Sequence, residues 1–182
     1  GNAKSCLGLK EILEDNWNVV LVIAYRRSYS FSYLSISSAI KAKIIFLVKR
    51  FFFYNLINRF RRIKSFKFEN MSELCKKYGV IYFSTSDKTL YRFSNKIQSF
   101  SPDVILSNGW QFKITENIFS LANLIALNCH SSYLPEYRGG NITYAPLINE
   151  EKESGVTVHQ IVNKFDAGPI LAQERVSIDS SE

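Results

Sequence analysis

The stretch "LIALNCHSSYLPEYRGG", residues 124–140, joins an apolar run to a sharp turn. The run ends in Asn128, Cys129 and His130, and a segment rich in Ser, Pro and Gly follows at once. A short apolar run bounded by turn residues is typical of a buried strand. Asn128 and His130 are two positions apart, so on a strand their side chains point to the same face. Ligands of open parallel sheets bind beyond the carboxyl ends of the strands. His130 is therefore a candidate catalytic or ligand-binding residue rather than a core histidine.

The rest of the chain alternates between strand and helix patterns. Strands are expected at 18–26, 80–86, 103–109, 124–130, 156–162 and 169–178. Helices are expected at 6–16, 72–79 and 88–100, with Asp87 capping the last of these, and 139–151 reads as a helix start. Strands separated by helices predict an α/β fold, with an open, mostly parallel sheet and helices on both faces.

The chain opens on "GNAKS", which resembles a strand-to-helix loop. An α/β domain usually begins with a strand, so we expect that the first strand is missing here. Residues 1–182 are then a single domain and a fragment of a longer one. A length of 182 residues and a hydrophobic content of 46% suit one well-buried globular domain.

Charge and cysteine usage narrow the class of protein. The formal charge of +7 favours anionic partners without choosing among phosphates, polyglutamates, nucleic acid or an acidic membrane surface. The three cysteines are far apart and form no Cys-x-x-Cys pair, which argues against a disulfide framework and a zinc site. No metal is expected, and a reduced, cytoplasmic setting is the simplest interpretation. No apolar run approaches the roughly 20 residues that span a bilayer.

Residues 41–67 combine Phe and Ile with many Lys and Arg residues. The simpler interpretation is a helix or insertion that packs on the sheet and leaves its cations in water. The alternative is peripheral contact with an anionic membrane.

A carboxylate lies downstream of the His130 turn. Asp166 sits in the Gly/Pro loop of "NKFDAGPI", residues 163–170, between two expected strands. A carboxylate there can orient an imidazole and stabilise its protonated form. Asn128, His130 and Asp166 together contain no nucleophile, so they suit acid–base work and oxyanion stabilisation in acyl transfer to a nucleophile on the substrate. A serine-hydrolase interpretation lacks the Gly-x-Ser-x-Gly elbow.

These motifs resemble the formyltransferase family, whose members transfer a formyl group from 10-formyltetrahydrofolate to an amine. The matching segments are "NCHSSYLPEYRGG" (128–140), "SGVTVHQI" (154–161) and "DAGPILAQ" (166–173), which agree in order and spacing. The match is strong over the second half of the chain and rests only on βα order in the first half. Ser131 and Tyr133 depart from the family pattern without removing a reacting group.

The resemblance implies a Rossmann-like catalytic domain with Asn128, His130 and Asp166 as catalytic residues. Asn128 and protonated His130 would stabilise the oxyanion, and Asp166 would hold His130 charged. For the folate donor it implies Gly109, Trp110, Phe112, Ala167 and Gly168. For the acceptor it implies Ser132, Arg138 and Gly139, with Arg138 gripping a phosphate or pairing with an acid. His159 lies within a strand pattern and is expected to be structural.

The acceptor is expected to be a small, anionic amine, with a nucleotide-linked amino sugar favoured. Glycinamide ribonucleotide and methionyl-tRNA are alternatives; other nucleic-acid partners are not favoured. Hydrolysis of 10-formyltetrahydrofolate and a non-catalytic, membrane-associated binding module also stay open. The sequence leaves the oligomeric state open.

Overall fold

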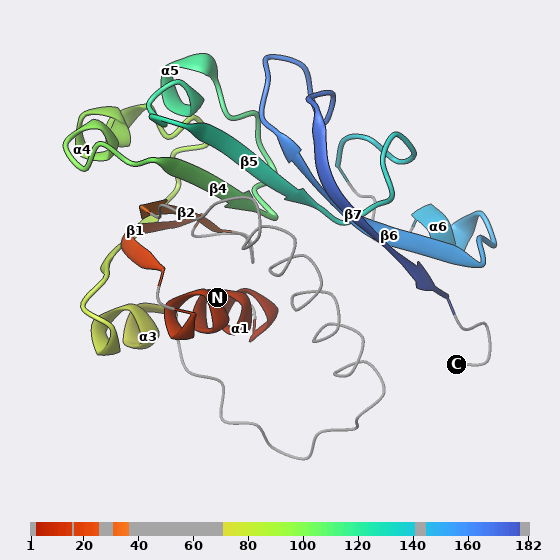
Figure 1. The fold of residues 1–182 in the computed structure, drawn as a ribbon, viewed down its shortest axis with the longest axis horizontal. Coiled ribbons are helices and arrows are strands. Elements are labelled where there is room, and N and C mark those ends of the chain that lie inside the picture. The colour runs from red at the N-terminus through yellow and green to blue at the C-terminus, as the bar shows by residue number, and fades with distance from the viewer. Residues whose placement is uncertain (1–2, 16, 26–30, 37–70, 141–144, 179–182) are drawn as a thin grey trace.

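A computed structural model of the chain describes residues 3–15, 17–25, 31–36, 71–140 and 145–178 (Figure 1). The helices are α1 (Ala3–Glu14), α3 (Met71–Lys77), η1 (Tyr91–Phe93), α4 (Ser94–Gln98), α5 (Glu116–Phe119) and α6 (Ala145–Ile148). The strands are β1 (Asn18–Tyr25), β2 (Phe31–Ile36), β3 (Ile81–Thr85), β4 (Val104–Asn108), β5 (Ile125–His130), β6 (Glu153–Gln160) and β7 (Ile170–Ser177). The expected segment 41–67 lies outside the described residues.

The described strands form one seven-stranded sheet in the order β3-β1-β2-β4-β5-β6-β7. The β1–β3 and β4–β5 pairs are parallel, as the alternation of strands and helices predicts. The other four neighbouring pairs are antiparallel, because β2 and β6 run against the rest. The expectation of a mostly parallel sheet is therefore wrong in its pairing: the fold is α/β, but the sheet is mixed.

Strand β2 was not predicted and accounts for two of the antiparallel pairs. It lies between β1 and β4, with Phe31 opposite Ala24 on one side and Asn108 on the other. It therefore joins the β3–β1 pair to the half of the sheet that carries the candidate site.

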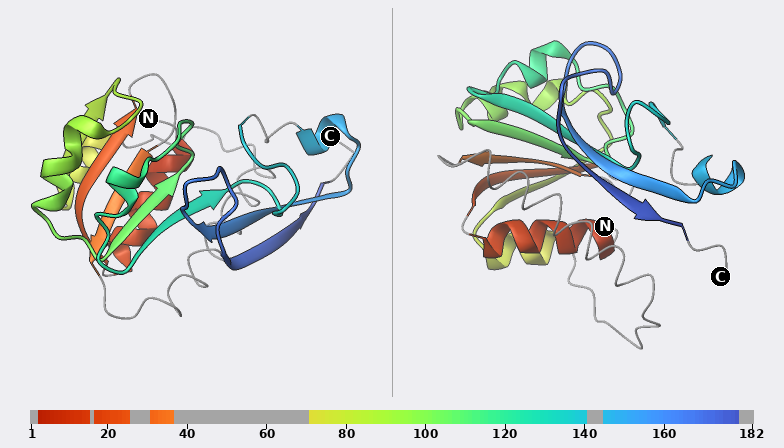
Figure 2. Two further views of the ribbon diagram at one scale, coloured as in Figure 1. Left: turned by 90° about the horizontal axis from the view of Figure 1, so that it is seen from above. Right: turned by 45° about the vertical axis from the view of Figure 1, so that its right-hand side comes forward.

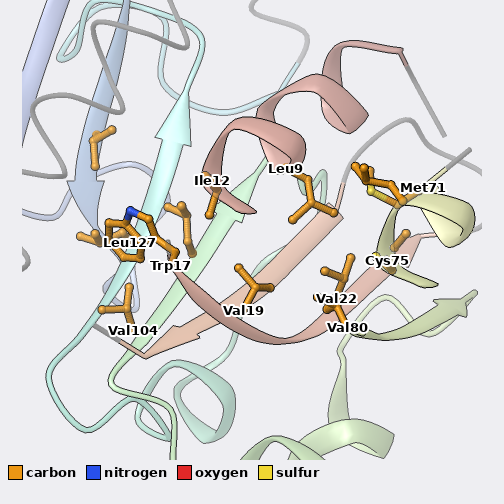
Figure 3. Packing of buried hydrophobic residues seen from close by; sticks show 14 residues of the cluster. Leu9, Ile12, Trp17, Val19, Val22, Met71, Cys75, Val80, Val104 and Leu127 are labelled. Carbon is orange, nitrogen blue, oxygen red and sulfur yellow. The ribbon is translucent and has the colours of Figure 1, made fainter. Parts of the chain in front are cut away.

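Helices cover both faces of the sheet, as expected (Figure 2). Helices α1 and α3 pack on one face through residues such as Leu9, Ile12 and Leu74, and Figure 3 shows this cluster. Helices α4 and α5 pack on the other face through Ile97 and Ile118. The continuous apolar run of β1 is buried in both clusters, which fits a strand covered on its two faces.

The alternation of side chains along β5 places the site. Leu127 belongs to the cluster under α1 and α3, and Cys129 packs against it. Ala126 belongs to the cluster under α4 and α5. Since side chains alternate along a strand, Asn128 and His130 point to the same face as Ala126.

Two expected helices differ from prediction. The segment 88–100 forms a 3-10 turn followed by the short helix α4, rather than one continuous helix. Leu90 rather than the expected Asp87 occupies the N-cap position, but the Asp87 carboxylate still accepts hydrogen bonds from the backbone N–H groups of Thr89 and Arg92. Of the segment 139–151, the four residues 141–144 lie outside the description, and α6 follows them. Among the residues that the structure describes, no helix is long and apolar enough to cross a membrane.

Candidate active site

A hollow of about 100 Å³ lies beside the end of β5, on the face of the sheet that α4 and α5 cover. Its walls come from β4 and the loop after it, from β5 and its turn, and from β6 and the loop that leads to β7. The lining residues are Ser107, Trp110, Gln111, Phe112, Lys113, Ile114, Asn128, His130, Gly139, Gly140, His159, Ile161, Val162, Lys164, Phe165 and Asp166.

The structure brings Asn128, His130 and Asp166 together in this hollow. Asn128 Nδ2 donates to Asp166 Oδ1 over 3.3 Å. His130 Nδ1 lies 3.6 Å from Asp166 Oδ2. One carboxylate therefore faces both an amide and an imidazole from the same face of β5.

The turn after β5 is tied to the loop that carries Asp166. The backbone N–H of Gly139 donates to Asp166 Oδ2 over 2.8 Å. Asp166 itself adopts a φ of 46°, in the left-handed region that Asp tolerates better than most residues. The hydrogen bond and the turn geometry together aim the carboxylate back at β5.

His130 is almost fully buried, with 6% of its surface exposed. Its Nε2–H donates to the Tyr137 carbonyl over 2.9 Å, which leaves Nδ1 facing Asp166. Burial lowers the pKa of His130 below its ordinary value, and it outweighs the Tyr137 carbonyl and the Asp166 carboxylate, which raise it. This geometry therefore does not support the expectation that Asp166 keeps His130 protonated, because the cost of desolvating the imidazolium dominates.

His159 is a fourth polar member of the site. The sequence analysis expected it to be structural and did not predict its contact with Asn128 and Asp166. It lies opposite Asn128 across the β5–β6 pair. Its Nε2 lies 3.3 Å from Asp166 Oδ1 and 3.2 Å from Asn128 Nδ2. Its Nδ1–H donates to the Gln160 carbonyl over 2.9 Å, which fixes the ring. The sequence around His159 carries no local signal for this role, because the role depends on the pairing of β6 with β5.

Asp166 is held in its ionised form by these neighbours. Burial raises the pKa of Asp166, but the hydrogen bond with His159 and that from the Gly139 N–H, with the nearby His130, outweigh burial and lower the pKa below its ordinary value. The site at neutral pH therefore combines an anionic carboxylate with a neutral His130 imidazole.

Trp110 and Phe112, two of the residues expected to contact the folate, form an apolar wall of the hollow. Their ring centroids lie 6.2 Å apart in an edge-to-face arrangement. Gly109, Ala167 and Gly168 do not line the hollow but flank it. Gly168 packs against the backbone of Gln160 so closely that a Cβ atom there would lie 2.0 Å from the Gln160 carbonyl oxygen. Gly168 thus shapes the loop that carries Asp166.

The three residues expected to bind the acceptor fall in different places. Gly139 lines the hollow. Ser132 is fully buried and donates to the Glu136 carbonyl over 2.8 Å, so it holds the turn rather than facing a ligand. Arg138 is exposed beside the turn.

Metal ligands and the nearby thiol complete the description of the site. Among the described residues, no group of three or more His, Cys, Asp or Glu side chains could hold a metal ion. Burial of the thiol raises the pKa of Cys129 to about 12, so this neighbour of the site is a neutral thiol.

Comparison of the chain with known protein families identifies one match. The family model described as "Formyl transferase" matches residues 56–182. The chain belongs to the formyl transferase family. The resemblance read from the segments around His130 and Asp166 is therefore confirmed at the level of the family.

Solved structures share the fold. A glycinamide ribonucleotide transformylase from Geobacillus kaustophilus aligns with a TM-score of 0.57 and 20% identity, over 90% of this chain and 84% of that one. A phosphoribosylglycinamide formyltransferase from Bacillus halodurans gives a TM-score of 0.57 and 17% identity, over 89% and 81%. The match to a glycinamide ribonucleotide transformylase from Symbiobacterium toebii has a TM-score of 0.52 and 23% identity. It covers 58% of this chain and spans about half of that protein, 53%.

Proposed function

We propose that this chain transfers a formyl group from 10-formyltetrahydrofolate to a primary amine of a small, anionic acceptor. The observation that supports this most directly is the meeting of the Asn128 amide, the His130 imidazole and the Asp166 carboxylate at one hollow. The site contains donors for an oxyanion and groups that exchange protons, and its chemistry needs only a nucleophile that the substrate brings.

The transfer begins when the acceptor amine attacks the formyl carbon and negative charge develops on the formyl oxygen. The Asn128 side chain supplies N–H donors for this oxygen. The neutral His130 ring accepts the proton that the amine loses, directly or through a water molecule. Protonated His130 then lies beside the Asp166 carboxylate, which stabilises the imidazolium across 3.6 Å.

Collapse of the tetrahedral intermediate breaks the bond between the formyl carbon and N10 of the folate. His130 returns its proton to N10 as that nitrogen departs, so the proton leaves the amine and ends on tetrahydrofolate. The burial that lowers the pKa of His130 keeps the ring ready to accept a proton at neutral pH.

The folate ring system is proposed to bind against the wall that Trp110 and Phe112 form. The two rings stand nearly perpendicular, so they offer one ring face and one ring edge as apolar contacts beside the polar residues of β5. A ring system held there would bring its formyl group towards Asn128 and His130, which line the same hollow.

The favoured acceptor is a nucleotide-linked amino sugar, because "GNAKS" and the segment after Arg138 differ from the patterns of the other acceptor classes. Glycinamide ribonucleotide is the second candidate, since the similar structures named above are a phosphoribosylglycinamide formyltransferase and a glycinamide ribonucleotide transformylase. Both acceptors carry a primary amine and phosphate, and both suit the basic charge of the chain.

The test is to incubate the protein with 10-formyltetrahydrofolate and a panel of amines while following tetrahydrofolate release. The panel contains nucleotide-linked amino sugars, glycinamide ribonucleotide and methionyl-tRNA. Release that depends on one amine identifies the acceptor. Formate release without any amine would show that the protein hydrolyses 10-formyltetrahydrofolate rather than transferring its formyl group. Folate binding without turnover would show that the protein is a binding module and not an enzyme.

A further inference from the structure

We propose that Gln173 on β7 is a positioning residue for the transfer, and that it acts on His130 through the turn after β5, residues 131–140. This inference rests on the proposed function, because it concerns the geometry of the same site. Gln173 does not line the hollow, so an effect of its side chain on the reaction has to pass through the turn.

Gln173, Thr157 and His130 form one row across three neighbouring strands. Thr157 of β6 lies opposite His130 of β5 on one side and opposite Gln173 of β7 on the other. Directly opposite residues of antiparallel strands point to the same face of a sheet. The turn folds back over this row, because the backbone of Leu134 meets the Thr157 and Gln173 side chains.

The side-chain amide of Gln173 ties the turn to the sheet. Its Nε2 donates to the Leu134 carbonyl over 2.7 Å and to Thr157 Oγ1 over 3.0 Å. An amide nitrogen carries two hydrogen atoms, and these two bonds use both of them. The amide therefore holds the backbone of the turn and the hydroxyl of β6 at the same time.

The Thr157 hydroxyl completes this attachment. Its Oγ1 accepts from the Leu134 N–H over 3.0 Å and donates to the Ser132 carbonyl over 2.8 Å. Thr157 and Ser132 are both 0% exposed, so bulk water does not replace a partner that is lost here. A buried polar group left without its partner costs more than the bond itself contributes.

The far end of the turn fixes the orientation of His130. Ser132 Oγ donates to the carbonyls of Glu136 and Tyr137, over 2.8 and 3.3 Å. The Tyr137 carbonyl also accepts from His130 Nε2 over 2.9 Å. Since a carbonyl only accepts, the hydrogen atom of the neutral ring lies on Nε2, and Nδ1 beside Asp166 is left to take a proton.

A connected set of buried hydrogen bonds thus runs from Gln173 to His130. Without the Gln173 amide, the Leu134 carbonyl loses its donor, and the turn shifts together with the Tyr137 carbonyl. The ring then also adopts the tautomer with its hydrogen atom on Nδ1, and this nitrogen no longer accepts the proton of the amine. A misplacement of about 1 Å at a reacting group can lower a rate about 100-fold.

The experiment replaces Gln173 by Met, which has a similar length and no hydrogen-bond donor. We expect kcat for transfer to fall roughly 10- to 100-fold, with KM for 10-formyltetrahydrofolate and for the acceptor within about threefold, because the lining of the hollow is unchanged.

Nitrogen-15 NMR of labelled histidine measures the tautomer directly. The chain has only two histidines, so His159→Ala assigns the signals of His130. In the unchanged protein the neutral His130 ring should carry its hydrogen atom on Nε2, and this share should fall in Gln173→Met.

Gln98→Met is the matched control. It makes the same change at an exposed position of α4 that does not line the hollow. Both kcat and the His130 signals should stay as they are in the unchanged protein.

Thr157→Ser and Thr157→Val test the attachment a second time, and they decide the matter if Gln173→Met does not fold. Serine keeps the hydroxyl and should hold kcat within about threefold. Valine has nearly the same shape without the hydroxyl, and it should lower kcat and shift the tautomer as Gln173→Met does.

An unchanged His130 tautomer in Gln173→Met would overturn the proposal, whatever the rate. A loss of kcat no larger than the unfolded fraction measured in urea would overturn it as well. The NMR measurement needs no substrate, so it tests Gln173 even when no amine is accepted. Failure of the unchanged protein to transfer a formyl group to any amine would overturn the proposed function alone.

Discussion

The backbone N–H of Gly139 donates to Asp166 Oδ2 over 2.8 Å, joining the turn after β5 to the loop between β6 and β7. The other oxygen of this carboxylate, Asp166 Oδ1, accepts a hydrogen bond from the Asn128 side chain. Asp166 is thus both a structural link between two loops and the only carboxylate that lines the hollow among the described residues. These two roles respond differently to substitution.

Asp166→Asn should keep the fold and nearly the same volume while removing the negative charge. The protonated His130 that forms during transfer then loses its stabilising partner, so single-turnover transfer should fall by about 100-fold or more. Binding of tetrahydrofolate should weaken much less, because we propose that the folate ring system contacts mainly Trp110 and Phe112. Transfer near the original rate would reduce Asp166 to a turn residue.

Asn128→Ala should lower transfer by about 100-fold, the usual loss for one oxyanion donor. The measurement is single-turnover transfer with folate binding recorded beside it. Asn123→Ala is a control, because the Asn123 amide donates to the Ser101 carbonyl far from the hollow. A drop in folate affinity that accounts for the whole loss would contradict an oxyanion role for Asn128.

His159→Ala should raise the pKa of Asp166. Burial raises that pKa, and the hydrogen bond with His159 is the strongest of the effects that lower it. A carbon-13 NMR titration of the Asp166 carboxyl should therefore move to higher pH in the variant. An unchanged titration would show that His159 serves only to pack β6 on β5.

Acid should destabilise the protein through His130 before it reaches the carboxylates. Because burial lowers the pKa of His130 in the folded state, the unfolded state binds more protons as pH falls through about 6.5, and the free energy of unfolding decreases. Asp166 acts in the same direction at lower pH, since its pKa is also lowered.

Urea unfolding across this pH range measures the effect. The unfolding midpoint should drop between about pH 7.5 and 5.5, and His130→Asn should flatten that drop. A midpoint that rises on acidification would mean that His130 is held protonated in the folded protein.

Gly168→Ala should disturb the loop that carries Asp166. The added Cβ meets the Gln160 carbonyl oxygen at 2.0 Å, a backbone atom that cannot move without shifting β6. We expect a loss of about 1–3 kcal/mol in unfolding free energy and a lower rate of transfer. Gly140→Ala is the stability control, since a Cβ there meets nothing within 4 Å.

The grouping of Asn128, His130 and Asp166 was predictable, because strand periodicity and the order of motifs can be recognised in short stretches of sequence. His159 was assigned to structure because alternation along β6 says which face it occupies but not which strand pairs with it. Only the antiparallel register that sets His159 opposite Asn128 brings it into the site. Pairing between strands is a long-range property that no short window contains.

Strand β2 and the charge state of His130 escaped prediction for related reasons. The "FSYLSI" segment is short and carries alternating serines, so it lacks the continuous apolar run that reveals a central strand. The protonation of His130 depends on how completely the fold removes water from the ring, which the sequence does not state. Burial overrode the nearby carboxylate that the motif made visible.

Asn128, His130, His159 and Asp166 all come from the contiguous segment 128–166, which runs from β5 through the turn, α6 and β6 to the loop before β7. The contact between Asn128 and Asp166 closes a loop of only 38 residues, and antiparallel pairing brings its ends together. Loop closure of this length costs little more entropy than closure of a loop half as long. The catalytic geometry can therefore assemble early in folding from neighbouring segments, and the aromatic wall can join it at the same stage, because the loop after β4 lies closer in sequence to Asn128 than Asp166 does.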